Sequence, residues 1–230
     1  MLIGVSHFEA DYFHDLLYLP AKRFAIIPNG ANFADFVDLP GSTYLSSRTS
    51  AQSLIVSVGR LERYKGHQRL ISALPKIQEQ RPGTRLLILG AGPYETTLRE
   101  LAQKVGVEGF VEIRAVPSSD RQAMADLLSQ ATLVALMSEY EAHPIAIMEA
   151  LALRRPVLVA NTSGMRELAE RGFVRAVSLS STPEEIAAAA LCQMEEPLVP
   201  AQLNLPTWED CTRQLLAIYR VSIGREQCVS

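Results

Sequence analysis

The chain has 230 residues, 48% of them apolar and 20% charged, which suits one large domain with appendages and a full apolar core. Its 22 basic and 25 acidic residues give a formal net charge of −3 without any basic run, which argues against a nucleic-acid-binding surface. No segment reaches the ~18 apolar residues of a membrane span, and the apolar residues 1–5 are too few for a signal peptide. The three cysteines have neither metal-ligand nor disulfide-framework spacing, which suits a reducing compartment and predicts a cytoplasmic protein.

The first fifty residues predict one helix and one strand. A capping-box spacing and an apolar face at helical period predict a helix over 6–18. An apolar run over 23–27 predicts a short strand, which the turn signal Pro28-Asn29-Gly30 ends. Residues 31–50 contain Pro-Gly and a Ser/Thr cluster, and they are interpreted as a linker.

Strands and helices alternate from residue 53 onward. Strands are expected at 53–58, 85–89, 110–114, 132–137, 156–160 and 173–178. Helices are expected over 66–80, 94–105, 119–129, 144–153, 164–171 and 183–194. Strands this apolar are buried on both faces, and the alternation implies parallel pairing. The pattern therefore predicts a doubly wound, Rossmann-like α/β domain that binds ligands at the carboxyl ends of its strands.

The last part of the chain predicts a helix that belongs to no strand–helix unit. It runs over 207–219, where Thr207 can cap it and acidic residues in the first turn complement its dipole. Residues 221–230 are expected to form a loose tail. The predicted organisation is thus an N-terminal piece (1–50), a sheet domain (51–200) and a C-terminal helix with its tail (201–230).

Two carboxylates lie eight residues apart after the strand at 132–137. Glu141 is in a polar turn, Pro144 fits the first position of the following helix, and Glu149 is one to two turns further along. A helix N-terminus attracts phosphate, and a carboxylate can accept two hydrogen bonds from a vicinal diol. The pair can therefore hold a sugar on one side and a ribose on the other, as a nucleotide-sugar requires. Taken without other signals, a surface Glu and a helix Glu without partners would be the simpler interpretation.

The loop after the strand at 53–58 carries two cations. Arg60 supplies a forked donor and Lys65 a point charge, so a diphosphate at the strand ends can be held by both. Solvated charges on an exposed loop are the alternative. The expected fold weakens that alternative, because it places this loop at the ligand-binding edge.

Other candidate motifs are weaker. Gly90-Ala91-Gly92-Pro93 opens a helix, but Glu95 stands where a dinucleotide fingerprint needs its third glycine, so the segment is interpreted as a tight turn. His143 lies between the two carboxylates, where either a donor contact or a structural role fits. His67 is expected to be a partial helix cap, and Ser163 the cap of the helix over 164–171. No residue set has metal-site spacing, and no G-x-S-x-G or P-loop pattern occurs.

These segments together resemble the donor-binding half of a retaining GT-B glycosyltransferase of family 4. The family patterns I-P-N-G-V-D, V-G-R-x₄-K-G, G-x-G-P, E-x₇-E and G-x-x-E-L are matched in order. The matching segments are Pro28-Asn29-Gly30, Val58-Gly59-Arg60 with Lys65-Gly66, Gly90-Ala91-Gly92-Pro93, Glu141 to Glu149, and Gly164 with Glu167-Leu168. The helix that begins at Trp208 resembles the helix by which the family's chain crosses back to its other domain.

The resemblance implies a role for each site residue. Arg60 and Lys65 would bind the donor diphosphate, Glu141 the sugar and Glu149 the ribose, with backbone contacts to the base near Val116. It assigns catalysis to Arg60, Lys65 and Glu141, and donor binding to Arg60, Lys65, Val116, Glu141, His143 and Glu149. No metal or cofactor is implied, since the nucleotide-sugar is a substrate.

The chain also departs from the family pattern. It has Ala31-Asn32 in place of V-D, and Ala142-His143-Pro144 where the family has G-F-G after the first Glu. Pro144 has no N–H to offer a phosphate or sugar. Residues 1–50 would correspond to the end of the acceptor domain and the interdomain linker, so the rest of the acceptor domain is expected to be missing from this chain.

Three functions stay open on this basis. The first is a glycosyltransferase that is present as its donor-binding half, cytoplasmic or peripheral to the membrane in its full-length form. The second is a nucleotide-sugar-binding module without its own catalysis, or a subunit that works with a separate acceptor-domain chain. The third is a sugar-nucleotide epimerase of the same architecture, which would need cleft acids and bases beyond His143 and the two glutamates. Apolar side chains on the first and last helices predict self-association; they include Phe8, Tyr12, Phe13 and Trp208.

Overall fold

A six-stranded parallel sheet forms the centre of the computed structural model, which describes residues 1–31, 53–117, 119–200 and 203–223. Its strands are β3 (Leu54–Val58), β4 (Arg85–Leu89), β5 (Val111–Arg114), β6 (Leu133–Leu136), β7 (Val157–Ala160) and β8 (Arg175–Val177). Their spatial order is β5-β4-β3-β6-β7-β8. The chain moves outward from β3 and then restarts on its other side with β6, which confirms the predicted doubly wound α/β fold.

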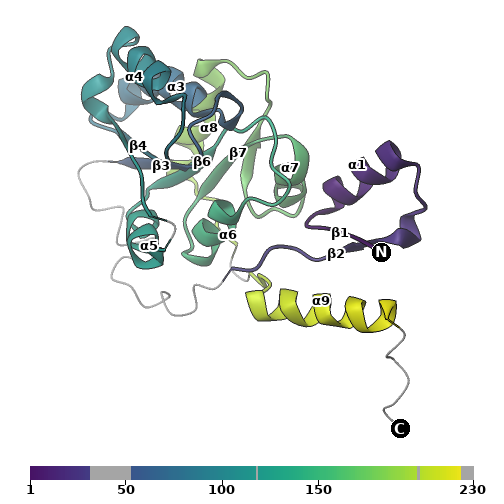
Figure 1. Cartoon of the computed structure of the whole chain (residues 1–230). Helices are drawn as coiled ribbons and strands as arrows, with labels where there is room; N and C mark the ends of the chain where they lie inside the picture. The colour runs from purple at the N-terminus through teal and green to yellow at the C-terminus, as the bar shows by residue number, and fades with distance from the viewer. Residues whose placement is uncertain (32–52, 118, 201–202, 224–230) are drawn as a thin grey trace.

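Helices cover both faces of this sheet, with α3, α4 and α8 on one face and α5 and α6 on the other (Figure 1). The helices are α3 (His67–Gln80), α4 (Glu95–Lys104), α5 (Arg121–Ser129), α6 (Ile145–Ala152), α7 (Ser163–Glu170) and α8 (Pro183–Glu195). The described residues also form the short 3₁₀ turns η1 (Ala21–Arg23), η3 (Arg63–Lys65) and η4 (Glu108–Phe110). Each predicted strand–helix unit is therefore present, with boundaries that differ from the prediction by at most two residues.

Alternate strand residues belong to two separate apolar cores, one on each face of the sheet. Ile55 of β3 packs with α3, α4 and α8, whereas its neighbour Val56 packs with α5, α6 and α7. Both side chains are buried. Because successive strand residues point to opposite faces, a strand between two helix layers must be apolar at every position, which is the pattern that predicted it.

A smaller unit lies beside the main sheet. It consists of β1 (Leu2–Gly4), α1 (His7–Leu17) and β2 (Phe24–Ile26), and its two strands pair in parallel. The predicted helix and second strand are confirmed. The strand β1 was not predicted, since three residues are too few to show a periodicity.

The last helix, α9 (Trp208–Ser222), packs against the segment that follows β2. Thr207 and Asp210 form a capping box at its start, which confirms the predicted cap. The Cys211 thiol donates to the carbonyl of Pro28 at 2.8 Å, and the Ala31 N–H donates to the carbonyl of Pro206 at 2.8 Å. The helix therefore ties the end of the chain to the smaller unit (Figure 1).

Some predictions fall outside the described residues. The linker over 31–50 lies almost entirely in residues 32–52, and residues 224–230 hold most of the predicted tail. The domain boundaries expected near residues 50 and 200 lie in or beside such segments, so they stay predictions. In the described part of the chain, no helix is long and apolar enough to cross a bilayer.

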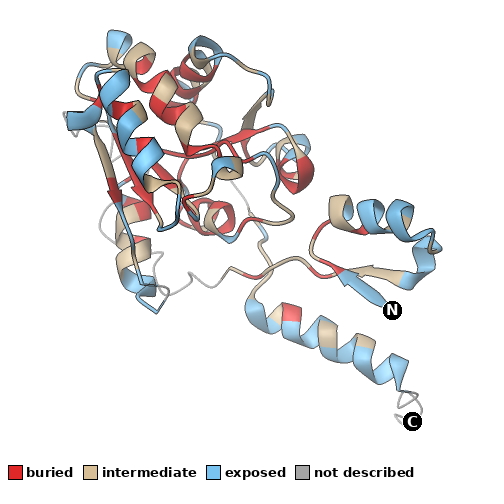
Figure 2. Ribbon diagram, turned by 45° about the horizontal axis from the view of Figure 1, so that its top comes forward, coloured by how far each residue is buried: buried red, intermediate tan, exposed pale blue. Residues whose placement is uncertain are grey.

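Much of α1 and most of α9 are exposed (Figure 2), and their exposed residues include large apolar ones. Tyr12, Phe13 and Trp208 are exposed, as the sequence predicted. Phe8 is half-buried, because its ring packs edge-on against Tyr140 at a centroid distance of 5.7 Å. Self-association through these side chains stays a prediction.

Candidate functional site

The candidate site lies where the strand order reverses. β3 and β6 are neighbours in space, so the loop after β3 and the turn after β6 meet at one edge of the sheet. Lys65, at the end of the β3 loop, donates to Oε1 of Glu141 at 2.6 Å across 76 positions of sequence. In doubly wound folds this reversal point is where ligands bind. The structure thus brings together two of the predicted site residues.

The Lys65–Glu141 pair is well enclosed. The two side chains are only 16% and 13% exposed, and the Ser138 hydroxyl also donates to Glu141 Oε1 at 2.9 Å. A charge out of water needs such partners, because an unpaired one would carry a large desolvation penalty. The Lys65–Glu141 pair is therefore an enclosed, hydrogen-bonded ion pair at this edge of the sheet.

The start of α7 holds the backbone of Glu141. The Glu141 N–H donates to Ser163 Oγ at 2.9 Å, and the Gly164 N–H donates to the carbonyl of Glu141 at 2.9 Å. A Cβ at Gly164 would lie 1.7 Å from the carbonyl oxygen of Ala142, so this close approach requires glycine. Ser163 was predicted to cap α7. Instead it is the first residue of the helix, and its hydroxyl accepts from the Glu141 turn.

Arg60 lies on the same loop as Lys65 but is more exposed. Its guanidinium pairs with Glu62 at 2.9 Å and donates to the Tyr64 hydroxyl at 2.6 Å. The Arg60 side chain is 69% exposed, whereas the Lys65 side chain is 16% exposed. The predicted joint role of Arg60 and Lys65 at a diphosphate stays a prediction.

The His67 ring contacts the backbone of the loop that carries Arg60 and Lys65. His67 was predicted to be a partial helix cap, but Gly66 occupies the N-cap position and the His67 side chain is buried. Burial lowers the pKa of His67 to about 4, so the ring is neutral. Its Nε2–H can then donate to the Arg60 carbonyl at 3.3 Å while Nδ1 accepts from Ser57 Oγ at 3.0 Å. The ring thus links β3, the cationic loop and α3.

Close backbone contact also shapes the loop. A Cβ at Gly90 would lie 1.9 Å from the carbonyl oxygen of Gly59. The turn after β4 therefore presses directly against the loop after β3. This close approach requires that residue 90 has no side chain.

A cavity of about 290 Å³ lies next to this edge and contains the second glutamate. Its walls come from the ends of β3 and β4, the loop ahead of α5, and the first turns of α5 and α6. The lining residues are Val58, Gly59, Leu89, Val116, Pro117, Asp120, Arg121, Met124, Ile145, Ala146 and Glu149. Val116 and Glu149, which the sequence predicted to share a ligand, do line one cavity.

Glu149 is buried and has a cationic partner that the sequence did not reveal. Arg121, the first residue of α5, donates from Nη2 to Glu149 Oε1 at 2.5 Å. Burial raises the pKa of Glu149, and the Arg121 charge and hydrogen bond oppose that rise. Arg121 is 28 positions from Glu149 and belongs to no recognised motif, so only the fold brings the two together.

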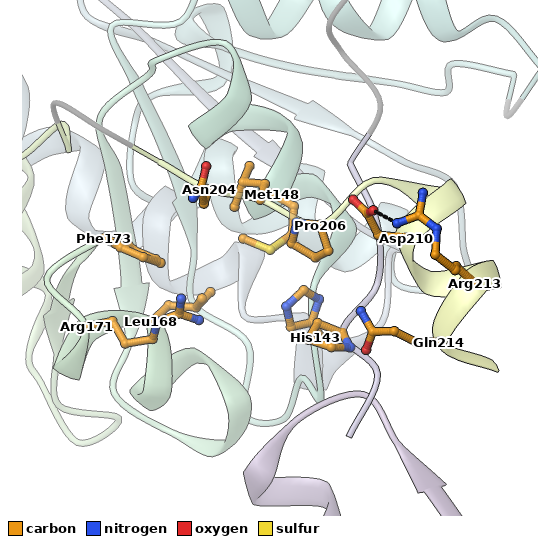
Figure 3. A pocket seen from close by; sticks show the side chains of 12 residues that line it. His143, Met148, Leu168, Arg171, Phe173, Asn204, Pro206, Asp210, Arg213 and Gln214 are labelled. Carbon is orange, nitrogen blue, oxygen red and sulfur yellow. Dashed lines mark hydrogen bonds and ion pairs between the residues drawn. The ribbon is translucent and has the colours of Figure 1, made fainter. Parts of the chain in front are cut away.

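His143 points into a different cavity. That cavity has a volume of about 460 Å³ and lies between α6, α7 and α9 (Figure 3). Its other lining residues include Met148, Arg171 and Arg213, but none of the cationic loop or the two glutamates. Burial, with a smaller contribution from nearby Arg171, lowers the pKa of His143 to about 4. The predicted donor contact by His143 therefore stays a prediction, and its ring lies away from the Glu149 cavity.

Pro144 lies one position earlier than predicted. It is the N-cap of α6, and Ile145 is the first helical residue. The preceding backbone is held by Asn29, whose side-chain amide donates to the carbonyl of His143 at 2.9 Å. The Asn of the Pro28-Asn29-Gly30 turn therefore anchors the segment between the two glutamates.

A family model described as "Glycosyl transferases group 1" matches residues 46–204 of the chain. The chain belongs to this family. The matched region contains the whole six-stranded sheet, the cationic loop and both glutamates. As a member of the glycosyl transferases group 1, the chain has a site whose position at the strand-order reversal fits a transferase.

Curated relatives carry glycosyltransferase names. An uncharacterized glycosyltransferase of Methanocaldococcus jannaschii is 30% identical over 173 residues, which cover 73% of this chain and 44% of that protein. A GDP-mannose-dependent alpha-(1-6)-phosphatidylinositol dimannoside mannosyltransferase of Mycobacterium tuberculosis is 29% identical, with 74% of this chain and 44% of that protein covered. The chain thus spans less than half the length of these relatives.

Solved structures share the fold at lower identity. Anabaena Alr3699/HepE in complex with UDP and glucose superposes with a TM-score of 0.79 at 19% identity, covering 95% of this chain and 62% of that one. Sucrose-phosphate synthase from Thermosynechococcus elongatus gives 0.78 at 21% identity, covering 97% and 58%. These similarities show the fold, and they agree with one Rossmann-like half of a GT-B architecture.

Proposed function

We propose that this chain is the donor-binding half of a retaining GT-B glycosyltransferase of family 4, which transfers a hexosyl group from a nucleotide-sugar to an acceptor. Arg60 and Lys65 would stabilise the negative charge that develops on the leaving diphosphate. Glu141 would orient the sugar and Glu149 the ribose, which is positioning rather than proton transfer. The base would lie near Val116.

One observation carries this proposal. Two carboxylates flank the strand-order reversal, and each is hydrogen-bonded to a cation, Glu141 to Lys65 and Glu149 to Arg121. An acid held in its charged form is a strong acceptor for the hydroxyls of a sugar or ribose. A nucleotide-sugar has both kinds of hydroxyl, separated by a diphosphate that needs a cation between them.

The relatives' names support a nucleotide-sugar donor in general terms. One relative is GDP-mannose-dependent, and structures with the same fold contain UDP, with glucose or as UDP-glucose. They differ in nucleotide, so the base and the sugar for this chain must come from a binding experiment.

A thermal-shift panel tests the proposal. UDP, GDP, ADP and TDP, and then their common nucleotide-sugars, are added to the purified chain. At ~100 times its dissociation constant, a bound ligand should stabilise the fold by about 2.7 kcal/mol. The matching nucleosides, which lack the diphosphate, are the control and should give a smaller shift. Unchanged melting curves with every diphosphate at millimolar concentration would contradict the proposal.

A nucleotide-sugar-binding module, or the donor subunit of a split enzyme, is the second candidate. The observation behind it is that every assigned group comes from one edge of one sheet. Holding an acceptor against the anomeric carbon can be worth ~7–11 kcal/mol of the barrier. We therefore expect the chain alone to bind donor without transferring sugar; measurable transfer by the purified chain would exclude this candidate.

A further inference from the structure

The pairing of Arg121 with Glu149 is unequal. The Glu149 side chain is 4% exposed, whereas the Arg121 side chain is 49% exposed, and both residues line the cavity. The hydrogen bond uses only Oε1. The other oxygen, Oε2, is the acceptor that a ligand in this cavity would need.

Few other charged residues in the cavity can offset the desolvation of the Glu149 carboxylate. Among the described residues that line the cavity, the charged ones are Asp120 and Arg121 from α5 and Glu149 itself from α6. The walls from β3 and β4, and Met124 and Ile145, are apolar. Desolvation is the largest influence on the pKa of Glu149 and raises it, and Arg121 provides the two influences that lower it. Loss of the Arg121 charge would therefore favour the protonated acid.

We propose that Arg121 is a positioning residue for the ribose of the donor nucleotide: it keeps Glu149 ionised and fixes one carboxylate oxygen, so that the other can accept from the ribose hydroxyls. This inference rests on the proposed function. Arg121 acts through Glu149 and need not touch the ligand. The two cations assigned to the diphosphate, Arg60 and Lys65, belong to the loop after β3 and are not among the residues that line this cavity.

An ionised and a protonated Glu149 would form different hydrogen bonds with the ribose hydroxyls. An ionised carboxylate accepts from both ribose hydroxyls, while a protonated acid offers weaker acceptors and a donor that a diol does not require. A 2′-deoxyribose lacks one of these hydroxyls. The preference for a ribonucleotide over its 2′-deoxy counterpart therefore reports the charge of Glu149, whereas a merely structural role of Arg121 would leave this ratio unchanged.

The experiment measures that preference by calorimetric titration at pH 6 and pH 8. UDP, GDP and ADP are each compared with their 2′-deoxy counterparts on the wild-type chain, and the tightest pair is then used for the variants. The wild type should prefer the ribonucleotide by about tenfold, the worth of one charge-assisted hydrogen bond. Arg121→Met should reduce this preference at least threefold at pH 6 and less at pH 8, because a higher pKa of Glu149 is overcome at higher pH.

Two further variants sharpen the result. Arg121→Lys restores a positive charge and should recover most of the preference at both pH values. Arg114→Met removes an exposed arginine at the end of β5, outside the cavity, and should leave the preference as in the wild type. Melting curves without ligand show that each variant is folded.

The outcomes distinguish failure of the role of Arg121 from failure of the proposed donor-binding function. A ribose preference that Arg121→Met leaves intact at both pH values would overturn the role of Arg121. A loss of preference that is equal at pH 6 and pH 8 and is not rescued by Arg121→Lys would also overturn it. If the folded wild-type chain binds none of the diphosphates, the proposed function itself fails, and the inference fails with it.

Discussion

The two ion pairs of the site have similar hydrogen-bond lengths but different surroundings. Lys65 and Glu141 are joined at 2.6 Å with both side chains largely enclosed, and α7 also holds the backbone of Glu141. Arg121 and Glu149 are joined at 2.5 Å with only the carboxylate enclosed. The first pair is a fixed part of the fold. The second is a buried acid whose pKa is raised by burial, a rise that its exposed partner opposes.

The two glutamates therefore differ in how the fold provides the cation that pairs with each carboxylate. On the proposed sugar side, the cation that holds Glu141 also belongs to the loop that would hold the diphosphate, so one residue serves both contacts. On the proposed ribose side, Arg121 comes from a different helix, α5, and its side chain is 49% exposed. We therefore expect loss of either cation to lower stability, because each leaves a buried carboxylate without its partner, and loss of Lys65 also to weaken diphosphate binding directly.

Lys65→Met should have the largest effect. It leaves Glu141 without its cationic partner in an enclosed site, which should lower the free energy of unfolding by about 3 kcal/mol. The variant should also lose the stabilisation that a nucleoside diphosphate gives. Urea denaturation with and without UDP or GDP measures both quantities.

Lys76→Met is the matched control for Lys65→Met. Lys76 also pairs with a glutamate, Glu79 at 2.8 Å, but on the exposed surface of α3. Exposed pairs contribute little, so this variant should keep both its stability and its response to nucleotide. Equal effects of the two substitutions would mean that the enclosure of the Lys65 pair has no energetic consequence.

The two glutamates should differ in which ligand they affect. Glu149→Gln should weaken a nucleoside diphosphate and the corresponding nucleotide-sugar alike, because both contain the ribose. Glu141→Gln should weaken the nucleotide-sugar more than the bare diphosphate. Loss of one charge-assisted hydrogen bond suggests ~1.5–3 kcal/mol in each case, measured by calorimetric titration. Glu112→Gln, on the exposed surface of β5, is the control.

Lowering the pH should change the free energy of unfolding in opposite directions through His67 and through Glu149. The pKa of His67, which supports the cationic loop, is about 4 in the fold against 6.5 ordinarily, so the unfolded chain binds more protons between these values. Stability should therefore fall by about 2 kcal/mol through His67 when the pH is lowered from 7 to 5. The pKa of Glu149 is raised, so its protonation favours the fold and partly offsets this loss.

Variants can resolve these opposing contributions. His67→Gln should flatten the dependence of unfolding free energy on pH between 5 and 7, and Glu149→Gln should steepen it on the acid side. His143, whose pKa is also lowered to about 4, adds a loss of the same sign. The His67 series is therefore measured in a His143→Phe background. A slope that His67→Gln leaves unchanged would show that this histidine is not neutral in the fold.

The sequence predicted the sheet because buried parallel strands are apolar throughout. It predicted Glu141, Glu149 and Lys65 because their segments resemble the family's E-x₇-E and V-G-R-x₄-K-G patterns. It did not predict Arg121 or the buried position of His67. Arg121 meets Glu149 only after α5 and α6 pack side by side, and no local pattern encodes that contact. A histidine beside a glycine at a helix start looks exposed in sequence, and only the neighbouring β3 encloses it.

Ser163→Ala should have the smallest effect, and it tests whether the sugar side is as fixed as its contacts indicate. The variant removes the acceptor of the Glu141 N–H but keeps the bond from the Gly164 N–H to the Glu141 carbonyl. We expect a loss of about 1 kcal/mol in unfolding free energy, the usual net worth of one hydrogen bond. Affinity for a nucleotide-sugar should fall, while affinity for the bare diphosphate should stay, because the turn positions the Glu141 carboxylate. Thr162→Ala removes the neighbouring hydroxyl, which donates to Glu139 instead, and is the matched control. If both variants weaken the nucleotide-sugar equally, the hydroxyl of Ser163 has no special part in placing Glu141.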